Sequence, residues 1–148
     1  MFEALTRPEI AIIAGVIVAV ALVLLARSLG RETLIYGVGL SFAALVYVAF
    51  GLQRSAPAAH LGLELAGVVV YGVVGLLGIR RWPALLALGW TGHTAWDLFL
   101  HHANGPGFAP VWYAMFCVGF DLSLGGYIAG WVAAPHRSPR LRGQRDVT

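Results

Sequence analysis

The sequence predicts an all-α protein, a polytopic bundle of five transmembrane helices, because of its composition and its long apolar runs. Hydrophobic residues make up 59% of the 148 residues and charged residues only 11%, and the mean hydropathy is +0.77. A helix needs roughly 20 apolar residues to cross about 30 Å of hydrocarbon. A backbone inside lipid must satisfy its own hydrogen bonds, and runs this uniformly apolar do not alternate as barrel strands do. Helices are therefore expected.

Five apolar segments of sufficient length follow one another, separated by short connections. The last connection contains Gly105, Pro106 and Gly107, a composition typical of a loop. The chain length suits one compact domain, so we expect a single transmembrane domain over residues 1–134. The expected spans are residues 9–29, 33–52, 59–79, 84–102 and 110–133.

The positions of the arginines predict the orientation of the chain, which contains no lysine. Cytoplasmic connections carry an excess of basic residues. If the C-terminus is cytoplasmic, only Arg7 and Arg54 lie on the outer side. We therefore expect an outer N-terminus, a cytoplasmic C-terminus and a multi-pass protein of the inner (plasma) membrane. The arginines assigned to the inner side are Arg27, Arg31, Arg80, Arg81, Arg137, Arg140, Arg142 and Arg145.

Residues 135–148 form a polar, basic tail for which we expect no fixed structure. Its four arginines would be attracted to anionic lipid of the inner leaflet, at about 1 kcal/mol each. The simpler interpretation is that they fix the topology. A tail this short does not favour nucleic-acid binding.

The last three of the five spans carry acidic and histidine side chains away from the outer arginines, whereas the first two have no ionisable group in their interiors. His93, Asp97 and His101 follow one another at four-residue intervals, and His60 and Glu64 have the same spacing, which places each set on one helix face. Ionisable groups at membrane depth are costly and usually mark a functional site. The full set is His60, Glu64, His93, Asp97, His101, His102 and Asp121, with the only cysteine, Cys117, four residues before Asp121.

A rise of about 1.5 Å per residue arranges these groups in three layers, all in the outer half of the bilayer. The first two spans contribute only Tyr36, Ser41 and Tyr47 to the interior and are expected to form a supporting wall. From the surface inward, the expected layers are His60 with His101 or His102, then Glu64 with Asp97 and Cys117, then His93 with Asp121.

This residue set predicts a site for a divalent metal, zinc or iron. Histidine and carboxylate four residues apart are a common way for a helical bundle to hold such ions. His93 and His101 lie about 12 Å apart along the axis and cannot share one ion, so one ion near Asp97 and two stacked ions are both open. Without metal, the same groups could act as acid and base. The candidate ligands are His60, Glu64, His93, Asp97, His101 and Asp121.

Each residue also has a structural interpretation. His102 is near a helix end, where polar residues are common. Asp121 and His93 could form an ion pair that only locks helices together. Cys117 and Trp96, which we place in a secondary role, are more often packing residues. The glycines of the third and fifth spans are assigned to close helix packing; they are Gly67, Gly72, Gly75, Gly78, Gly126 and Gly130.

Residues 89–97 read Gly-Trp-Thr-Gly-His-Thr-Ala-Trp-Asp and are followed by His101 and His102. This element resembles an uncharacterised family of small bacterial integral membrane proteins, in which Gly-Trp…His-x-x-Trp-Asp…His-His follows a basic loop like residues 80–81. The resemblance covers the last three spans and implies a glutamate where Glu64 stands. Two residues separate the aspartate from the histidine pair in the family, whereas three do so here. The resemblance implies a site and names no reaction.

Three classes of function follow. The first is a membrane-embedded enzyme, a hydrolase or isomerase for an amphipathic or lipid-like substrate. In it Asp97, His93, Glu64 and Asp121 would be catalytic, holding a metal that activates water or moving protons. The second is a proton or metal-ion binding or transport module, for which an oligomer would complete the path. The third is a structural membrane protein with an interhelical polar network.

Overall fold

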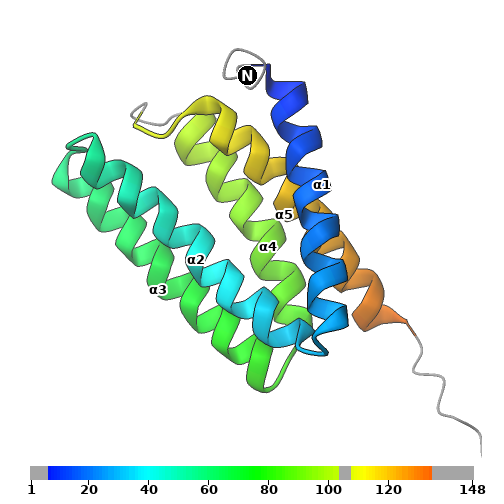
Figure 1. Ribbon diagram of the computed structural model, residues 1–148. Helices are drawn as coiled ribbons and strands as arrows, with labels where there is room; N and C mark the ends of the chain where they lie inside the picture. Colours follow the sequence, from blue (N-terminus) through cyan, green and yellow to red (C-terminus); the bar gives the residue numbers. More distant parts are fainter. Residues whose placement is uncertain (1–6, 104–107, 135–148) are drawn as a thin grey trace, which may run out of the picture.

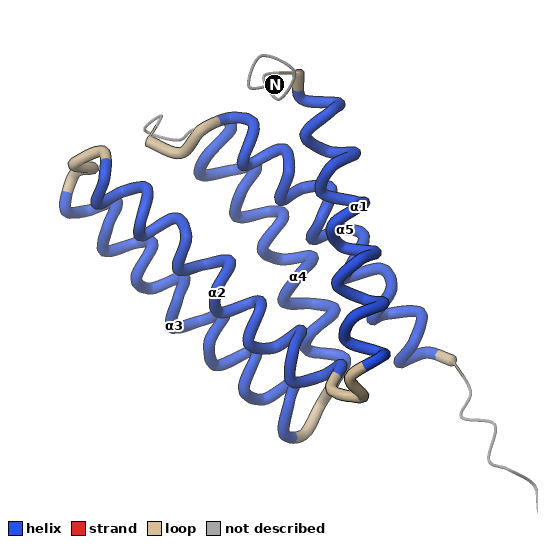
Figure 2. The backbone as a smooth tube through the Cα atoms, in the orientation of Figure 1, coloured by secondary structure: helices blue, strands red, loops and turns tan. Residues whose placement is uncertain are grey.

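The computed structural model of the protein describes residues 7–103 and 108–134, with the side chains of residues 101–103 left out of the description (Figures 1 and 2). The expected basic tail at 135–148 lies outside the described residues. The described part is helical, with elements α1 Pro8–Ser28, α2 Glu32–Gln53, α3 Ala58–Arg80, α4 Ala84–Trp96, the π-helical segment η2 Asp97–Ala103, and α5 Val111–Ala133.

The predicted all-α fold is confirmed, and every expected span agrees with a helix to within one residue at each end. Four helices, α1, α2, α3 and α5, are long and apolar enough to cross a membrane. The helix α4 has only 13 residues, but η2 continues it for 7 more, so that together they match the fourth expected span.

The bundle consists of two helix pairs joined by α4. In Figure 1, α1 lies along α5 and α2 lies along α3, while α4 contacts α2, α3 and α5. Large apolar side chains point outward, including Phe42 at 66% and Leu88 at 68% exposure. The interior contains aromatic, small and polar side chains together with aliphatic ones such as Leu40 and Leu86, both fully buried. An apolar exterior around a partly polar interior is the pattern expected of a protein surrounded by lipid.

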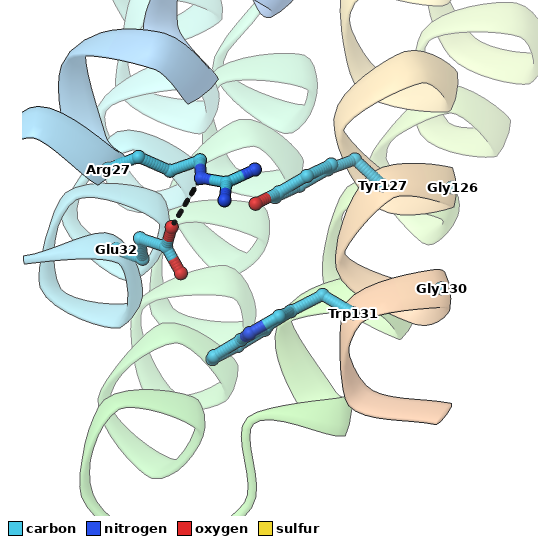
Figure 3. Close-up of a pocket in the computed structure, with 6 residues that line it drawn as sticks. All are labelled: Arg27, Glu32, Gly126, Tyr127, Gly130 and Trp131. Carbon is cyan, nitrogen blue, oxygen red and sulfur yellow. Dashed lines mark ion pairs between the residues drawn. The ribbon is translucent and has the colours of Figure 1, made fainter. Parts of the chain in front are cut away.

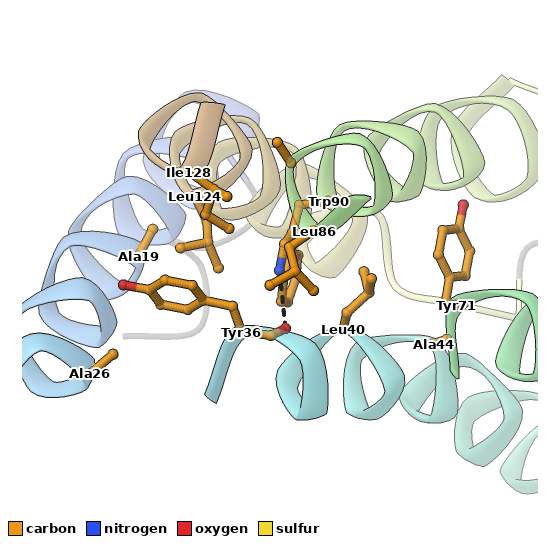
Figure 4. Close-up of a cluster of buried hydrophobic side chains, with 11 residues drawn as sticks. Ala19, Ala26, Tyr36, Leu40, Ala44, Tyr71, Leu86, Trp90, Leu124 and Ile128 are labelled. Atoms are coloured by element: carbon orange, nitrogen blue, oxygen red, sulfur yellow. Dashed lines mark hydrogen bonds between the residues drawn. The ribbon is translucent and has the colours of Figure 1, made fainter. Parts of the chain in front are cut away.

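A cluster of buried aromatic and aliphatic side chains occupies the end of the bundle where α1 ends and α2 begins (Figure 4). Within it, the indole N–H of Trp90 donates a hydrogen bond to the carbonyl oxygen of Tyr36 over 3.2 Å. Because Trp90 is on α4 and Tyr36 on α2, this bond fixes α4 against α2 one turn away from His93.

The turn between α1 and α2 is a tight helix ending that requires glycine. Gly30 has a φ of +63°. Its backbone N–H donates a hydrogen bond to the carbonyl oxygen of Arg27, and the N–H of Arg31 donates one to the carbonyl oxygen of Ala26. This pair of bonds is the Schellman motif. The turn brings Arg27 within 3.7 Å of Glu32, the first residue of α2.

Glycines allow α1 and α5 to touch through their backbones. A Cβ on Gly15 would collide with the carbonyl oxygen of Phe116, and a Cβ on Gly119 would collide with that of Ile12. Small residues at such crossings permit close van der Waals packing, which drives helix association where lipid removes the hydrophobic effect. The α1–α5 pair therefore depends on these two glycines.

We predict that Gly15→Ala destabilises the protein because its Cβ collides with backbone, which cannot move aside as a side chain can. Overpacking of this kind costs about 1–3 kcal/mol. Gly62→Ala is the matched control, because a Cβ on Gly62 meets nothing within 4 Å. Thermal unfolding in detergent should show a lower Tm for Gly15→Ala alone. Equal Tm values for both variants would contradict the α1–α5 packing.

Candidate metal site

The helices α4 and α5 are held close together beside the candidate site by Gly125. A Cβ on Gly125 would lie 2.8 Å from the hydroxyl of Thr91 and 3.3 Å from the carbonyl oxygen of Ala87. Any larger residue would therefore push α5 away from α4. Asp121 precedes Gly125 by one helical turn and shares its face, so this close approach brings Asp121 to α4.

Three buried side chains meet at this contact. His93 comes from α4, Asp97 from the first position of η2, and Asp121 from α5. The imidazole Nδ1 of His93 lies 2.8 Å from Oδ2 of Asp121 and 3.5 Å from Oδ2 of Asp97. The three side chains are 0–1% exposed. A single imidazole nitrogen thus faces two carboxyl groups in a site closed to solvent.

Each of the three residues offers one ligand atom, and these atoms lie within 4.8 Å of one another. Among the described residues, this is the cluster of histidine, cysteine, aspartate or glutamate that could hold a metal ion. Two of their polar atoms have no hydrogen-bond partner in the described part of the chain, Nε2 of His93 and Oδ1 of Asp121. Buried polar atoms are nearly always partnered, and an ion or water is a common partner. One imidazole and two carboxylates are a donor set that suits zinc, iron or manganese. The buried group could therefore hold a metal ion.

The site lies near the middle of its helices. Asp121 is 10 residues after Val111 and 12 before Ala133. His93 is 9 residues after Ala84 and 10 before Ala103, the last residue of η2. The distance from either end is therefore about 15 Å at 1.5 Å per residue.

Aromatic side chains from α2, α3 and α4 surround the imidazole. The ring of Tyr71 lies 4.9 Å from that of His93, with Tyr47 at 6.1 Å and Trp90 at 6.5 Å between ring centroids. Tyr47 also interacts electrostatically with Asp97. Tyr47 was expected in a supporting wall, and its place beside the imidazole, like that of Tyr71, was not predicted from the sequence. The available signal was a tyrosine in the middle of an apolar span, because tyrosine usually occupies the membrane interfaces.

His93 pairs with Asp121, as the expected layers placed them. Asp97 was expected in a separate layer with Glu64, but it joins the His93–Asp121 pair. The physical reason is that Asp97 follows His93 by one turn of the same helix, so its carboxyl group reaches the same imidazole nitrogen. Cys117 is buried one helical turn before Asp121 on α5, and its expected secondary role in the site stays a prediction.

Glu64 is buried on α3 but is not among the three grouped ligand residues. The indole N–H of Trp96 donates a hydrogen bond to its Oε2 over 3.3 Å. Trp96 packs closely against α3, because a Cβ on Gly67 would lie 2.9 Å from its ring. Trp96 therefore links Glu64 to the helix that carries His93, and its expected secondary role in the site stays a prediction.

The other candidate ligands do not enter the three-residue group. His60 is half-buried in the first turn of α3 and is absent from that group. The side chains of His101 and His102 lie outside the described residues, so the expected contact of His60 with them stays a prediction. Of the six ligands expected from the sequence, the structure brings together His93, Asp97 and Asp121.

Comparison of the chain with protein-family models, with curated proteins and with solved structures finds no match. The resemblance of residues 89–102 to a family of small membrane proteins therefore stays a prediction. The site must be interpreted from its own geometry.

We predict that His93→Gln strongly destabilises the protein, because it leaves two buried carboxyl groups facing each other. Removing one partner of a buried ion pair costs about 3–5 kcal/mol. Adding Asp121→Asn should recover part of this loss, since the second substitution removes one of the opposing groups. Thermal or denaturant unfolding of both single variants and the double variant gives their coupling energy, which should be about 0.5–3 kcal/mol. Purely additive effects would mean that the two side chains do not interact.

Proposed function

We propose that this protein is an integral membrane protein that binds one divalent metal ion, zinc or iron, through His93, Asp97 and Asp121. The observation that carries the proposal is the meeting of one imidazole and two carboxyl groups, fully buried, with Nε2 of His93 and Oδ1 of Asp121 lacking a hydrogen-bond partner among the described residues. The proposed location is the inner (plasma) membrane, with the bilayer as the first partner.

Charge balance favours a divalent ion at this position. Two ionised carboxylates and a neutral imidazole carry a charge of −2, which is costly in a low-dielectric interior. A divalent cation cancels that charge, whereas without metal the site must hold extra protons. Metal and protons therefore compete, and metal binding should release protons and strengthen as the pH rises.

We propose that the chain crosses the membrane five times. The continuous α4–η2 helix has 13 and 7 residues, and 20 residues at about 1.5 Å each reach roughly 30 Å, the thickness of the hydrocarbon core. With five spans, Arg27, Arg31 and residues 80–81 lie at one end of the bundle, and Arg7 and Arg54 at the other. The positive-inside rule then places the N-terminus outside and the C-terminus in the cytoplasm.

A membrane-embedded enzyme, a hydrolase or isomerase for a lipid-like substrate, is the second candidate. Its support is that three protein ligands are the number found in catalytic zinc sites, where a fourth position receives water or substrate. In addition, Asp97 begins a π-helical segment, a geometry that often occurs at functional sites. In such an enzyme a bound metal would activate water. Asp97, His93 and Asp121 would hold the metal, and Glu64 would lie outside the ligand group. The enzyme candidate is tested by incubating metal-loaded protein with total lipid extract and analysing the products by mass spectrometry. Unchanged lipids would argue against this activity.

The alternatives from the sequence, a transport module and a purely structural network, use the same three residues. They differ in their consequences. Transport requires ion or proton flux in proteoliposomes, and a structural network requires no metal. Anionic lipid at the C-terminal tail and assembly into an oligomer stay predictions.

We predict about one equivalent of zinc or iron per chain in protein purified in detergent, measured by elemental analysis. Asp97→Asn and Asp121→Asn should each remove most of this metal, because each deletes a charged ligand. Loss of one metal contact or its supporting partner typically lowers affinity by about 10–100-fold. Glu9→Gln is the matched control, because Glu9 is an exposed carboxylate in the first turn of α1.

Two results would contradict the metal proposal. The first is wild-type protein without metal after reloading with zinc or iron. The second is metal that persists at full stoichiometry in both aspartate variants. If the wild type binds no metal and Asp97→Asn and Asp121→Asn lower the Tm, we would assign His93, Asp97 and Asp121 to a structural network.

We predict that single cysteines will report the proposed topology in a Cys117→Ala background. Gln53→Cys should react with a membrane-impermeant maleimide in intact cells, because it ends α2 on the proposed outer side. Ser28→Cys, at the end of α1, should react only after the membrane is opened. Both positions are exposed in the structure. The opposite labelling pattern would reverse the orientation, and labelling of both in intact cells would contradict a membrane crossing by α2.

A further inference from the structure

A pocket that combines one ion pair with a largely apolar lining lies where α1 ends, α2 begins and α5 approaches its C-terminus (Figure 3). Its volume is about 410 Å³, within the range of roughly 300–1,000 Å³ typical of ligand pockets. It is separate from the three-residue site at the middle of α4 and α5. The residues that line it are Arg27, Glu32, Gly126, Tyr127, Gly130 and Trp131.

The pocket contains one cation and one anion in a loose pair. Nε of Arg27 lies 3.7 Å from Oε1 of Glu32, which is beyond hydrogen-bond distance. The guanidinium group extends toward the hydroxyl of Tyr127, and the indole of Trp131 lies on the other side of the opening (Figure 3). The Arg27 side chain is 63% exposed, whereas that of Glu32 is 19% exposed. Arg27 can therefore turn to a ligand while Glu32 stays at the wall.

Two glycines keep the α5 side of the pocket open. Gly126 and Gly130 are one helical turn apart and share a face. A Cβ on either of them would meet nothing within 4 Å. Both were expected to pack against a neighbouring helix, but among the described residues no helix lies against them. Their missing side chains instead leave space beside Tyr127 and Trp131.

We propose that this pocket binds the headgroup of a phospholipid that carries both a phosphate and a primary amine, the phosphatidylethanolamine class. The guanidinium of Arg27 matches a phosphate with paired N–H donors. The carboxylate of Glu32 accepts hydrogen bonds from an ammonium group, and the face of Trp131 attracts the same cation. Because the cation and the anion of the pocket balance, a zwitterionic headgroup fits better than a headgroup with a net negative charge.

The position of the pocket agrees with a lipid ligand. The helices α1, α2 and α5, which form it, are each long and apolar enough to cross a membrane, and the pocket lies near their ends. Tyrosine and tryptophan are enriched at the level of lipid headgroups. The lipid tails could therefore stay in the bilayer while the headgroup enters the pocket. This inference does not depend on metal binding at His93.

Native mass spectrometry of the full chain in detergent, titrated with phosphatidylethanolamine or phosphatidylglycerol, tests the proposal. We expect phosphatidylethanolamine to bind at least about tenfold more tightly. Arg27→Gln should weaken binding of both lipids, because both carry the phosphate. Glu32→Gln should shift the preference toward phosphatidylglycerol, because it removes the partner of the amine and leaves the pocket positively charged.

Filling the pocket provides a test that does not alter charge. Gly126→Leu should abolish phosphatidylethanolamine binding without lowering Tm, and Gly62→Leu, at another open glycine, should leave binding unchanged. Retained binding in Gly126→Leu, or equal binding of the two lipids to the wild type, would overturn the proposal. Water-soluble phosphoethanolamine that binds as tightly as the lipid would overturn the lipid as the source of the headgroup.

Discussion

The imidazole of His93 lies between two carboxyl groups inside a bundle whose outer surface is apolar. In hydrocarbon, a carboxylate without a partner costs several kcal/mol or more. The rest of the interior can be understood as enclosing this group. Tyr47 and Tyr71 come from one helix pair, Asp121 comes from the other, and α4 carries His93 between them.

Backbone contact makes this enclosure possible. Gly125 lets α5 approach α4, and Gly15 and Gly119 let α1 approach α5. Such contacts set the spacing of the helices that carry the site. Rigid helices hold ligand atoms more accurately than loops do. The same fold leaves Gly126 unpacked beside a pocket, so close packing and open space alternate along α5.

The helices were predictable from the sequence because apolar runs of about 20 residues carry a strong signal, and all the helix ends agree to within one residue. The pairing of His93 with Asp121 was also predictable, because counting residues from the helix ends placed both at the same depth. Depth alone does not give rotation about the helix axis. For this reason the link from Glu64 to Trp96 was missed. Asp97 was assigned to a layer with Glu64 because depth was counted along the helix axis, although a side chain can reach a partner one turn away.

Aromatic neighbours and open glycines were harder to predict for a related reason. Tyr71 carries no charge that marks it within an apolar run, and its contact with His93 depends on how α3 packs against α4. Gly126 and Gly75 look alike in the sequence. Only the packed bundle shows that a Cβ on Gly75 would lie 2.6 Å from the carbonyl oxygen of Gly37, whereas one on Gly126 would meet open space.

X-ray absorption spectroscopy on zinc-loaded protein tests the central claim most directly. The account predicts a zinc ion with one imidazole nitrogen and carboxylate oxygens at about 2.0–2.2 Å. The imidazole contribution to the spectrum should disappear in His93→Gln. A spectrum dominated by sulfur, which would implicate Cys117, or one in which the imidazole signal survives His93→Gln, would contradict the account.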